Sequence, residues 1–260
     1  MLNGGFGNLL GRKGTWASPS NNNSEYPNNT GFKSGELQSA ENGAMVTTCS
    51  SVVGIKFDRG VMIAADTLVS YGNLSRFQNI DRVFKINHNI LLGGSGDFPD
   101  VQCIHRTIEQ KMLEDQFYEK NIDMRPQALS TWLTRITYTR NLWMKPLFVD
   151  LVVGGIDAGG KPYLANVNFR GRAFTDYVVT AGFARGMVVP LVRQSKPQRR
   201  EFTAQEASNL ISKCMEVLYY RNVRSISQYT VGICTENCCD VEGPFKVDEK
   251  WDVADMIRGY

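Results

Sequence analysis

The chain has 260 residues, of which 21% are charged and 42% hydrophobic, and its formal net charge is +3. This length suits one large domain or two small ones, and this charge balance does not indicate broad binding to nucleic acid or to a membrane. No stretch approaches the roughly 18 consecutive apolar residues of a membrane span, and the opening residues lack the apolar core of a secretory signal, so we expect neither.

Residues 1–45 are rich in asparagine, glycine and serine. Such a composition buries too little apolar area to offset the entropy of an ordered chain, so we expect a disordered leader there. The composition changes after this segment. We therefore expect one structured domain over residues 46–245 and a short C-terminal tail over residues 246–260.

The first part of this domain predicts a β-meander. "SVVGIKF" (51–57) has the period of a strand, "DRG" (58–60) predicts a turn, and "VMIAAD" (61–66) is apolar enough to be buried on both faces. Two further strands are predicted at "VFKI" (83–86) and "ILLGGSG" (90–96).

Two amphipathic helices are predicted next. The first follows Asp97, a candidate N-cap, and the second begins at Pro126, where the missing N–H of proline costs no hydrogen bond. Their apolar positions recur at helical spacing, at Val101, Ile104, Ile108 and Met112 in the first and at Leu129, Trp132, Leu133 and Ile136 in the second.

A second group of strands follows the two helices. "FVDLVVGGI" (148–156) and "KPYLANVNF" (161–169) predict a hairpin, and "RAFTDYVV" (172–179) is expected to continue the same sheet. "FARGMVVPLVRQ" (183–194) predicts a short third helix.

The last part of the domain predicts a long helix and a closing hairpin. Thr203 and Glu206 have the spacing of a capping box, which would open a helix that runs to about Arg221. The hairpin is expected from "YTVGIC" (229–234) and "CDVEGPF" (239–245).

The order of these elements predicts the fold class. Strands, two helices, strands, two helices and strands follow one another, and each amphipathic helix pair must cover a sheet face. Two stacked antiparallel sheets, each covered on its outer face by a helix pair, would bury the apolar face of every helix. The expected fold is therefore α+β, a four-layer α-β-β-α sandwich of two antiparallel sheets.

Six cysteines occur in the chain, and the adjacent pair Cys238 and Cys239 suits a disulfide framework poorly, so we expect reduced thiols. These two and Cys234 resemble a metal cluster only in number, because the two histidines lie in another part of the chain and zinc needs four ligands. We expect no metal and no other cofactor. The basic residues 196–201 are expected to form a solvated loop rather than a nucleic-acid site.

Three stretches carry a resemblance: "GIKFDRGVMIAADT" (54–67), "ILLGGSGDFPD" (90–100) and "EVLYYRNVRSISQYTVGICTE" (216–236). They resemble the proteasome β-subunits, which are N-terminal nucleophile hydrolases, and the match spans about residues 50–245. "GNLSRFQNIDR" (72–82) most resembles the non-catalytic animal subunits at the seventh position of the β ring.

The resemblance implies where a catalytic constellation would lie. Active members use an N-terminal threonine as nucleophile, and its own α-amine accepts the proton. A lysine, an aspartate that orients it, a glycine loop that forms the oxyanion hole, a serine and an aspartate–serine pair complete the site. In this chain the resemblance places Ser50 at the nucleophile, Arg82 at the lysine and Asp66 at the aspartate that orients it. It places Gly96 in the glycine loop, Ala181 at the serine, and Asn222 and Ser225 at the aspartate–serine pair.

Four positions depart from the active pattern. Cys49 stands where a glycine would precede the cut, and Arg82 does not give up its proton. Ala181 has no hydrogen-bonding side chain, and Asn222 carries no charge. Because catalytic groups act as a unit, we expect no catalytic residue in this degenerate pocket and a structural ion pair between Arg82 and Asp66.

Two other functions stay open. The first is an active peptidase of the same superfamily that uses Ser50, Cys49 or Thr48 as its N-terminal nucleophile, and the mass of the mature N-terminus would distinguish it. The second is a free-standing binding domain on the same fold, which the native size of the protein would reveal.

The resemblance also implies partners and a cellular location. The partners are other β-subunits in the same and the opposite ring and the subunits of the α rings, and the location is the cytoplasm and nucleus. The leader would be removed upstream of Ser50, near residues 41–46. In the tail, Trp251, Ala254 and Ile257 repeat at roughly helical spacing, with Met256 nearby. Trp251, Met256 and Ile257 are expected to contact the opposite β ring.

Overall fold

The computed structural model describes residues 47–117, 124–196 and 201–251. The described residues all belong to one compact unit of the chain, residues 38–260. No helix within these described ranges is long and apolar enough to cross a membrane.

Several sequence predictions fall outside the described residues. The expected leader lies there, as does most of the basic loop at residues 196–201. Met256 and Ile257 of the tail lie there as well. These predictions therefore stay predictions.

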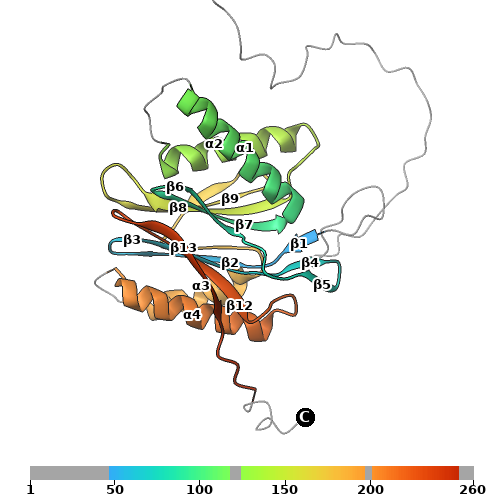
Figure 1. The fold of residues 1–260 in the computed structure, drawn as a ribbon, viewed down its shortest axis with the longest axis vertical. Coiled ribbons are helices and arrows are strands. Elements are labelled where there is room, and N and C mark those ends of the chain that lie inside the picture. Colours follow the sequence, from blue (N-terminus) through green and yellow to red (C-terminus); the bar gives the residue numbers. More distant parts are fainter. Residues whose placement is uncertain (1–46, 118–123, 197–200, 252–260) are drawn as a thin grey trace, which may run out of the picture. The chain divides into compact units, whose positions relative to one another are not determined.

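Two antiparallel sheets organise the described chain (Figure 1). The first sheet has the order β10 (Ala173–Thr175), β9 (Pro162–Asn168), β8 (Val149–Ile156), β7 (Ile90–Asp97), β1 (Thr47–Cys49), β4 (Val69–Tyr71) and β5 (Leu74–Phe77), and β6 (Val83–Asn87) also pairs with β7. The second sheet has the order β11 (Val178–Ala181), β2 (Val52–Phe57), β3 (Gly60–Asp66), β12 (Gln228–Thr235) and β13 (Cys239–Lys246).

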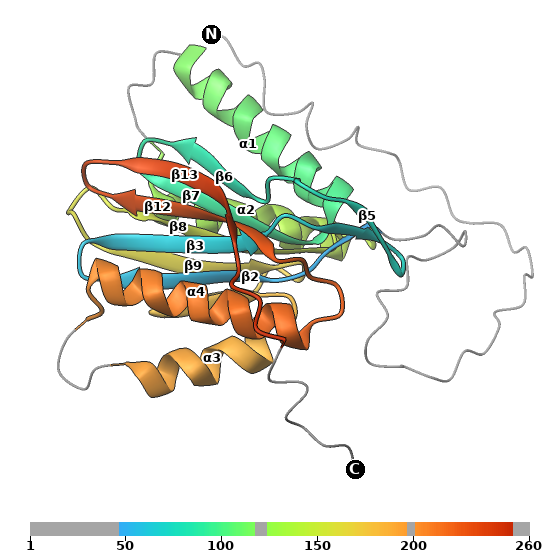
Figure 2. The same ribbon diagram turned by 60° about the horizontal axis from the view of Figure 1, so that its bottom comes forward.

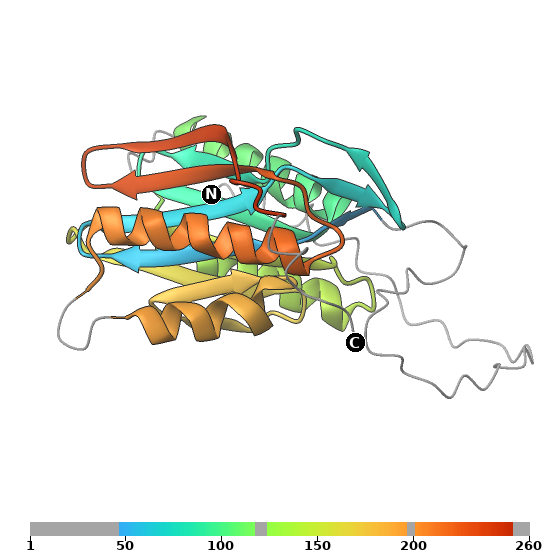
Figure 3. The same ribbon diagram turned by 90° about the horizontal axis from the view of Figure 1, so that it is seen from below.

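Four helices cover the outer faces of the two sheets, which confirms the predicted four-layer sandwich (Figures 1 and 2). α1 (Phe98–Phe117) and α2 (Pro126–Leu142) lie on the first sheet, and α3 (Ala184–Ser195) and α4 (Ala204–Arg221) lie on the second. In the view of Figure 3, α3 and α4 lie side by side and run roughly along the strands of the second sheet.

Three apolar clusters fill the spaces between the four layers, and their burial is the main stabilising contribution. One lies under α1 and α2, one between the sheets, and one under α3 and α4. Their members include Ile104, Leu129 and Leu151 in the first, Val52, Ile63 and Val152 in the second, and Val188, Ile211 and Met215 in the third. The strand predicted to be buried on both faces, β3, is buried at every position.

One predicted strand is wrong in extent. The stretch 172–179 does not form a single strand in one sheet, because β10 pairs with β9 in the first sheet and β11 pairs with β2 in the second. The chain crosses between the sheets at Asp176 and Tyr177. Its side-chain pattern could not reveal the crossing, since both halves carry apolar and β-branched residues.

Three short strands, β1, β4 and β5, were not predicted from the sequence. β1 and β4 have three residues each, too few to display a period. β5 forms one edge of the first sheet and is exposed at all four positions, with Leu74 59% and Phe77 43% exposed. A strand without a buried face shows no alternation in its sequence.

The predicted capping box is present at the start of α4. The Thr203 hydroxyl accepts the N–H of Glu206 at 3.3 Å, and the Glu206 carboxylate accepts the N–H of Thr203 at 3.0 Å. Two of the four backbone donors at the helix start are thereby satisfied. The predicted start of α2 at Pro126 is also confirmed.

Thr203→Ala should lower the free energy of unfolding by about 1 kcal/mol, because it removes the acceptor for the Glu206 N–H. Urea unfolding of the full chain measures the change. Gln205→Ala, on the exposed surface of the same first turn, is the matched control and should change stability much less. An equal effect of the two variants would contradict the role of the cap.

Candidate functional site

The guanidinium of Arg82 is fully buried at the junction of the two sheets. Its Nη1 donates to the Asp66 carboxylate at 2.5 Å and its Nη2 to the carbonyl of Ser51 at 2.6 Å. Longer contacts run from Nη1 to the carbonyl of Leu68 at 3.5 Å and from Nε to that of Gly94 at 3.4 Å. One side chain thus joins the start of β2, the end of β3, the segment after β3, and β7.

The structure contains the ion pair predicted for Arg82 and Asp66. Burial raises the pKa of the Asp66 carboxyl above its usual value, and the charge and hydrogen bond of Arg82 oppose that rise. Because arginine stays protonated, the Asp66 carboxyl always faces a positive charge, which favours its ionised form. The energetic importance of the pair lies in the loss that follows when one partner is removed, which leaves a buried charge unpaired.

Ser50, the position of the nucleophile, is held by hydrogen bonds at both its side chain and its backbone. Its hydroxyl accepts the side-chain amide of Asn222 and lies 3.4 Å from the hydroxyl of Ser51. The hydroxyl of Ser95 donates to the carbonyl of Ser50 and, at 3.3 Å, to that of Cys49. The residue is therefore fixed in place by polar groups that are neutral.

The residues immediately before Ser50 form β1, which is paired on both edges. Cys49 is opposite Gly96 of β7 on one side and Val69 of β4 on the other, and Thr48 is opposite Asp97 of β7. In Figure 1, β1 fills the space between these two strands. The chain before Ser50 is thus a strand inside the sheet.

Two glycines shape the backbone around this strand. Gly96 has φ +102°, and a Cβ there would lie 2.2 Å from the carbonyl oxygen of Phe148. Gly182 has φ +65°, and a Cβ there would lie 2.2 Å from the carbonyl oxygen of Ser50. At each position the positive φ and the nearby carbonyl oxygen both exclude a side chain, so only glycine fits. The presence of Gly96 therefore follows from the fold alone. Ala181, which precedes Gly182, is buried in β11 beside β2.

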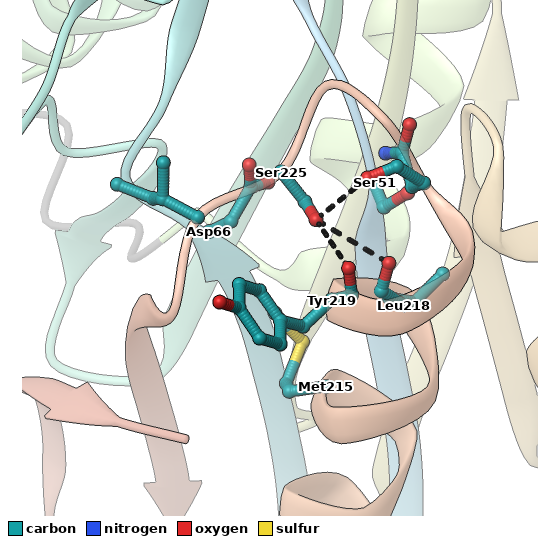
Figure 4. Close-up of a pocket in the computed structure, with 8 residues that line it drawn as sticks. Ser51, Asp66, Met215, Leu218, Tyr219 and Ser225 are labelled. Atoms are coloured by element: carbon teal, nitrogen blue, oxygen red, sulfur yellow. Dashed lines mark hydrogen bonds between the residues drawn. The ribbon is translucent and has the colours of Figure 1, made fainter. Parts of the chain in front are cut away.

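The end of α4 closes the other side of the site (Figure 4). The Ser225 hydroxyl donates to the carbonyls of Leu218 and Tyr219, each at 3.3 Å, and of Asn222 at 2.9 Å. These bonds add a partner for carbonyls at and just after the helix end, where the carbonyl of Leu218 also accepts the Asn222 N–H at 2.9 Å. The pocket between this helix end and Asp66 has no room for a water molecule.

The structure brings the seven positions together around the junction of β1 and β2. They are Ser50, Asp66, Arg82, Gly96, Ala181, Asn222 and Ser225. Sequence reasoning missed Ser95, which binds the Ser50 carbonyl, and Arg224, which binds the Thr48 hydroxyl at 3.4 Å and the Asn73 side chain at 3.2 Å. Ser95 adjoins the recognised Gly96, but no pattern singled out Arg224.

The arrangement supplies no base for the Ser50 hydroxyl. In the uncut chain the Ser50 nitrogen is in a peptide bond, and a free α-amine would arise only from a cut immediately before Ser50. Among the described residues, the side chains bonded to the hydroxyl are Asn222 and Ser51, and neither accepts a proton at neutral pH. In the same ranges, no three His, Cys, Asp or Glu side chains are grouped so as to hold a metal ion.

Comparison with known proteins places this arrangement in a family. The model of the family described as "Proteasome subunit" matches residues 46–234. The chain belongs to the proteasome subunit family.

Individual relatives refine this family membership. The chain is 62% identical over 217 residues to proteasome subunit beta type-4 of Drosophila melanogaster, covering 84% of this chain and 81% of that protein. It is 38% identical over 215 residues to proteasome subunit beta type-4 of Xenopus laevis, covering 83% and 88%. Proteasome subunit beta type-7 of Saccharomyces cerevisiae is 32% identical over 224 residues, covering 83% and 84%. The expected resemblance to proteasome β-subunits is confirmed, and both animal relatives carry the name beta type-4.

Arg82→Leu should lower the free energy of unfolding by about 3 to 5 kcal/mol, since it leaves the Asp66 carboxylate buried without its partner. Adding Asp66→Leu should recover part of the loss, because no unpaired charge then remains. Urea unfolding of the full chain measures both effects.

The matched control is Arg193→Leu. Its ion pair with Asp176 has side chains that are 60% and 30% exposed, so its loss should cost at most about 1 kcal/mol. If Arg82→Leu proved as mild as Arg193→Leu, the buried pair would not have the structural role assigned to it.

Asp97 makes the stability of this site pH-dependent. Burial first, and the neighbouring Asp100 second, raise its pKa from 3.8 to about 6. The folded chain holds the Asp97 proton more tightly than the unfolded chain does, because its pKa is higher in the folded state. The contribution of Asp97 to folding stability is therefore fully present below pH 4 and is lost as the pH rises through 6. Asp97→Asn should therefore stabilise the chain at pH 7.5 by about 1 kcal/mol, a figure already reduced for solvent screening, and should have almost no effect at pH 4.

Urea unfolding of wild type and variant across this pH range tests the sign. Asp58→Asn, on the exposed turn between β2 and β3, controls for the removal of a carboxylate. A variant that is less stable than wild type at pH 7.5 would show that the hydrogen bonds of Asp97 outweigh the cost of its charge.

Proposed function

We propose that this proteasome-family chain is a non-catalytic, structural subunit of the β ring in the 20S core particle. Its role is to support assembly of the particle that degrades ubiquitinated proteins. Its partners are other β-subunits in the same and the opposite ring and the subunits of the α rings. It acts in the cytoplasm and nucleus, without a cofactor.

The observation that carries this proposal is the guanidinium at the lysine position. Arg82 stays charged at physiological pH, so it cannot accept a proton, and its donors are engaged by Asp66 and by backbone carbonyls. A base for Ser50 would have to come from a free α-amine. That would need a cut immediately behind β1, a strand whose hydrogen bonds on both edges hold it in the sheet.

We further propose that the leader is removed upstream of this strand, near residues 41–46. Arg224 binds the Thr48 side chain, and the pairing of β1 begins at Thr47. Cleavage before Thr47 would leave all of these contacts in place. Active neighbouring subunits would do the cutting, because this chain offers no base of its own.

The tail is proposed to reach a subunit of the opposite β ring through Trp251, Met256 and Ile257. Trp251 is 55% exposed and packs edge-on against Tyr220 at 5.2 Å and Tyr219 at 6.0 Å, at the end of α4. The backbone N–H of the preceding residue donates to the Tyr220 hydroxyl at 2.6 Å. Half-exposed aromatic residues of this kind are frequent anchors at interfaces.

Ser50→Ala should leave every peptidase activity of the assembled particle unchanged, because the Ser50 hydroxyl has no base. Turnover of peptide substrates by purified variant particles measures this. Subunit abundance in the particle, and the mass of the mature N-terminus, serve as controls for assembly and processing.

Two results would count against the non-catalytic role. The first is loss of one specific activity in Ser50→Ala particles that assemble normally. The second is a mature wild-type chain that begins at Ser50, because such a chain has the free α-amine that an active member uses. A chain that migrates alone, outside any particle, would instead favour a free-standing binding domain.

Deletion of residues 249–260 should leave the fold and incorporation into one ring intact but slow the joining of two half-particles. Trp251→Ala should show part of this defect. The ratio of half-particles to full particles on native gels measures it. Trp143→Ala is a matched control, since that tryptophan is 51% exposed at the end of α2. An unchanged ratio after deletion, with normal subunit abundance, would assign the tail to its own subunit only.

A further inference from the structure

Cys234 and Cys239 face each other across the last hairpin of the fold. They are register partners in the antiparallel pair of β12 and β13. The hairpin turn at 236–237 is closed by the Thr235 N–H, which donates to the carbonyl of Cys238 at 2.7 Å. The next pair along the hairpin is then of the non-hydrogen-bonded type, in which Cα atoms lie about 4.5 Å apart and side chains approach most closely.

The two sulfur atoms already interact. The two thiols are near enough to affect each other's protonation, which lowers the pKa of Cys234 and raises that of Cys239. Both residues are buried, at 0% and 3% exposure. A Cα separation of about 4.5 Å lies inside the range that disulfides adopt without backbone movement. All six cysteines of the chain are free thiols.

The position of this pair leaves it protected but close to solvent. β13 is the edge strand of the second sheet, and residues 236–238 at the hairpin turn are exposed. Opening the end of an edge hairpin costs far less free energy than global unfolding. A small solute can therefore reach the two sulfurs, whereas a bulky reagent meets them only after a larger opening.

We propose that Cys234 and Cys239 form a redox modification site, at which a hydroperoxide converts the two thiols into a reversible cross-strand disulfide. This inference does not depend on the proposed function, since it concerns a hairpin remote in sequence from Ser50. The site would respond to oxidants inside an otherwise reducing compartment.

The reaction balances in two steps. The Cys234 thiolate attacks the terminal oxygen of the hydroperoxide, the O–O bond breaks, and the products are a sulfenic acid and, after protonation, water or an alcohol. The Cys239 thiol then attacks the Cys234 sulfur, the S–O bond breaks, and a second water leaves with the thiol proton. Two thiols lose two electrons and the peroxide gains them. A dithiol reductant returns both thiols by exchange and is itself oxidised to a disulfide.

The exposed neighbour Cys238 is not part of this site. Its thiol donates to the Asp240 carboxylate at 2.9 Å, and that carboxylate also binds Lys85 at 2.7 Å. The bond to Asp240 raises the pKa of Cys238, which makes its thiolate scarce. Successive side chains near a strand point to opposite faces, so Cys238 points away from Cys239. Exposure alone would select Cys238, and Cys103 on α1, as the first thiols to react.

The disulfide would act locally. It closes a very short loop, so it constrains the unfolded chain only slightly. Its main effect is to keep β13 paired with β12 at the hairpin end. β13 is also the last strand before the C-terminal tail.

The test is to treat the full chain with hydrogen peroxide, block the remaining thiols and digest it at glutamate residues. Cleavage after Glu236 separates Cys234 from Cys238 and Cys239, so a disulfide appears as two linked peptides. We expect this linked pair in wild type, its loss on treatment with dithiothreitol, and its persistence in Cys238→Ser. Cys239→Ser should abolish it. Cys103→Ser is the control for an exposed thiol elsewhere and should leave it unchanged.

Two outcomes would overturn the proposal. One is oxidation confined to Cys103 and Cys238 while Cys234 and Cys239 remain reduced, which is the pattern that exposure alone predicts. The other is loss of the linked pair in Cys238→Ser, which would show that Cys238 is the true partner. Because Cys238 is exposed, that variant is expected to fold, and the result does not depend on a buried substitution.

Discussion

A buried guanidinium holds the centre of this molecule together. The desolvation of Arg82 costs several kcal/mol, and it is offset only because a carboxylate and backbone carbonyls surround the group. Those acceptors come from β2, β3, the segment after β3, and β7, so one side chain fixes the relative positions of strands from both sheets. The place where β1 enters the first sheet depends on this arrangement.

The same arrangement distinguishes polar groups that hold the fold together from polar groups that could carry out a reaction. A reactive site needs a nucleophile with a base in reach and space for a substrate. Here the polar side chains of Ser95, Asn222 and Ser225 donate to carbonyl or hydroxyl oxygens of the protein itself. Each of these bonds fixes backbone or a helix end. Apart from one oxygen of the Asp66 carboxylate, which has no hydrogen-bond partner, the polar groups of the pocket bond to the protein itself, in keeping with the structural role proposed above.

Much of this was accessible from the sequence. The capping box at Thr203, the start of α2 at Pro126 and the doubly buried β3 each depend on local spacing, and the structure has all three. The ion pair of Arg82 and Asp66 followed from a family resemblance, because the two residues are far apart in the chain and no local pattern joins them. The crossing between sheets after β10, the pairing of β1 and the contacts of Arg224 are set by tertiary packing. Short segments carry too few side chains to encode such contacts in a period.

The exposed edge strand β5 has a consequence for the life of the newly made chain. Among the described residues nothing pairs with its outer backbone edge, which Leu74 and Phe77 flank, so this edge can accept a strand from a neighbour, and Arg76 is the single charge on the strand that opposes this. A free chain at high concentration is therefore prone to self-association. The time between synthesis and incorporation into a particle is when this surface is most hazardous. Cells that make the subunit in excess over its partners would have to shield this edge or degrade the surplus.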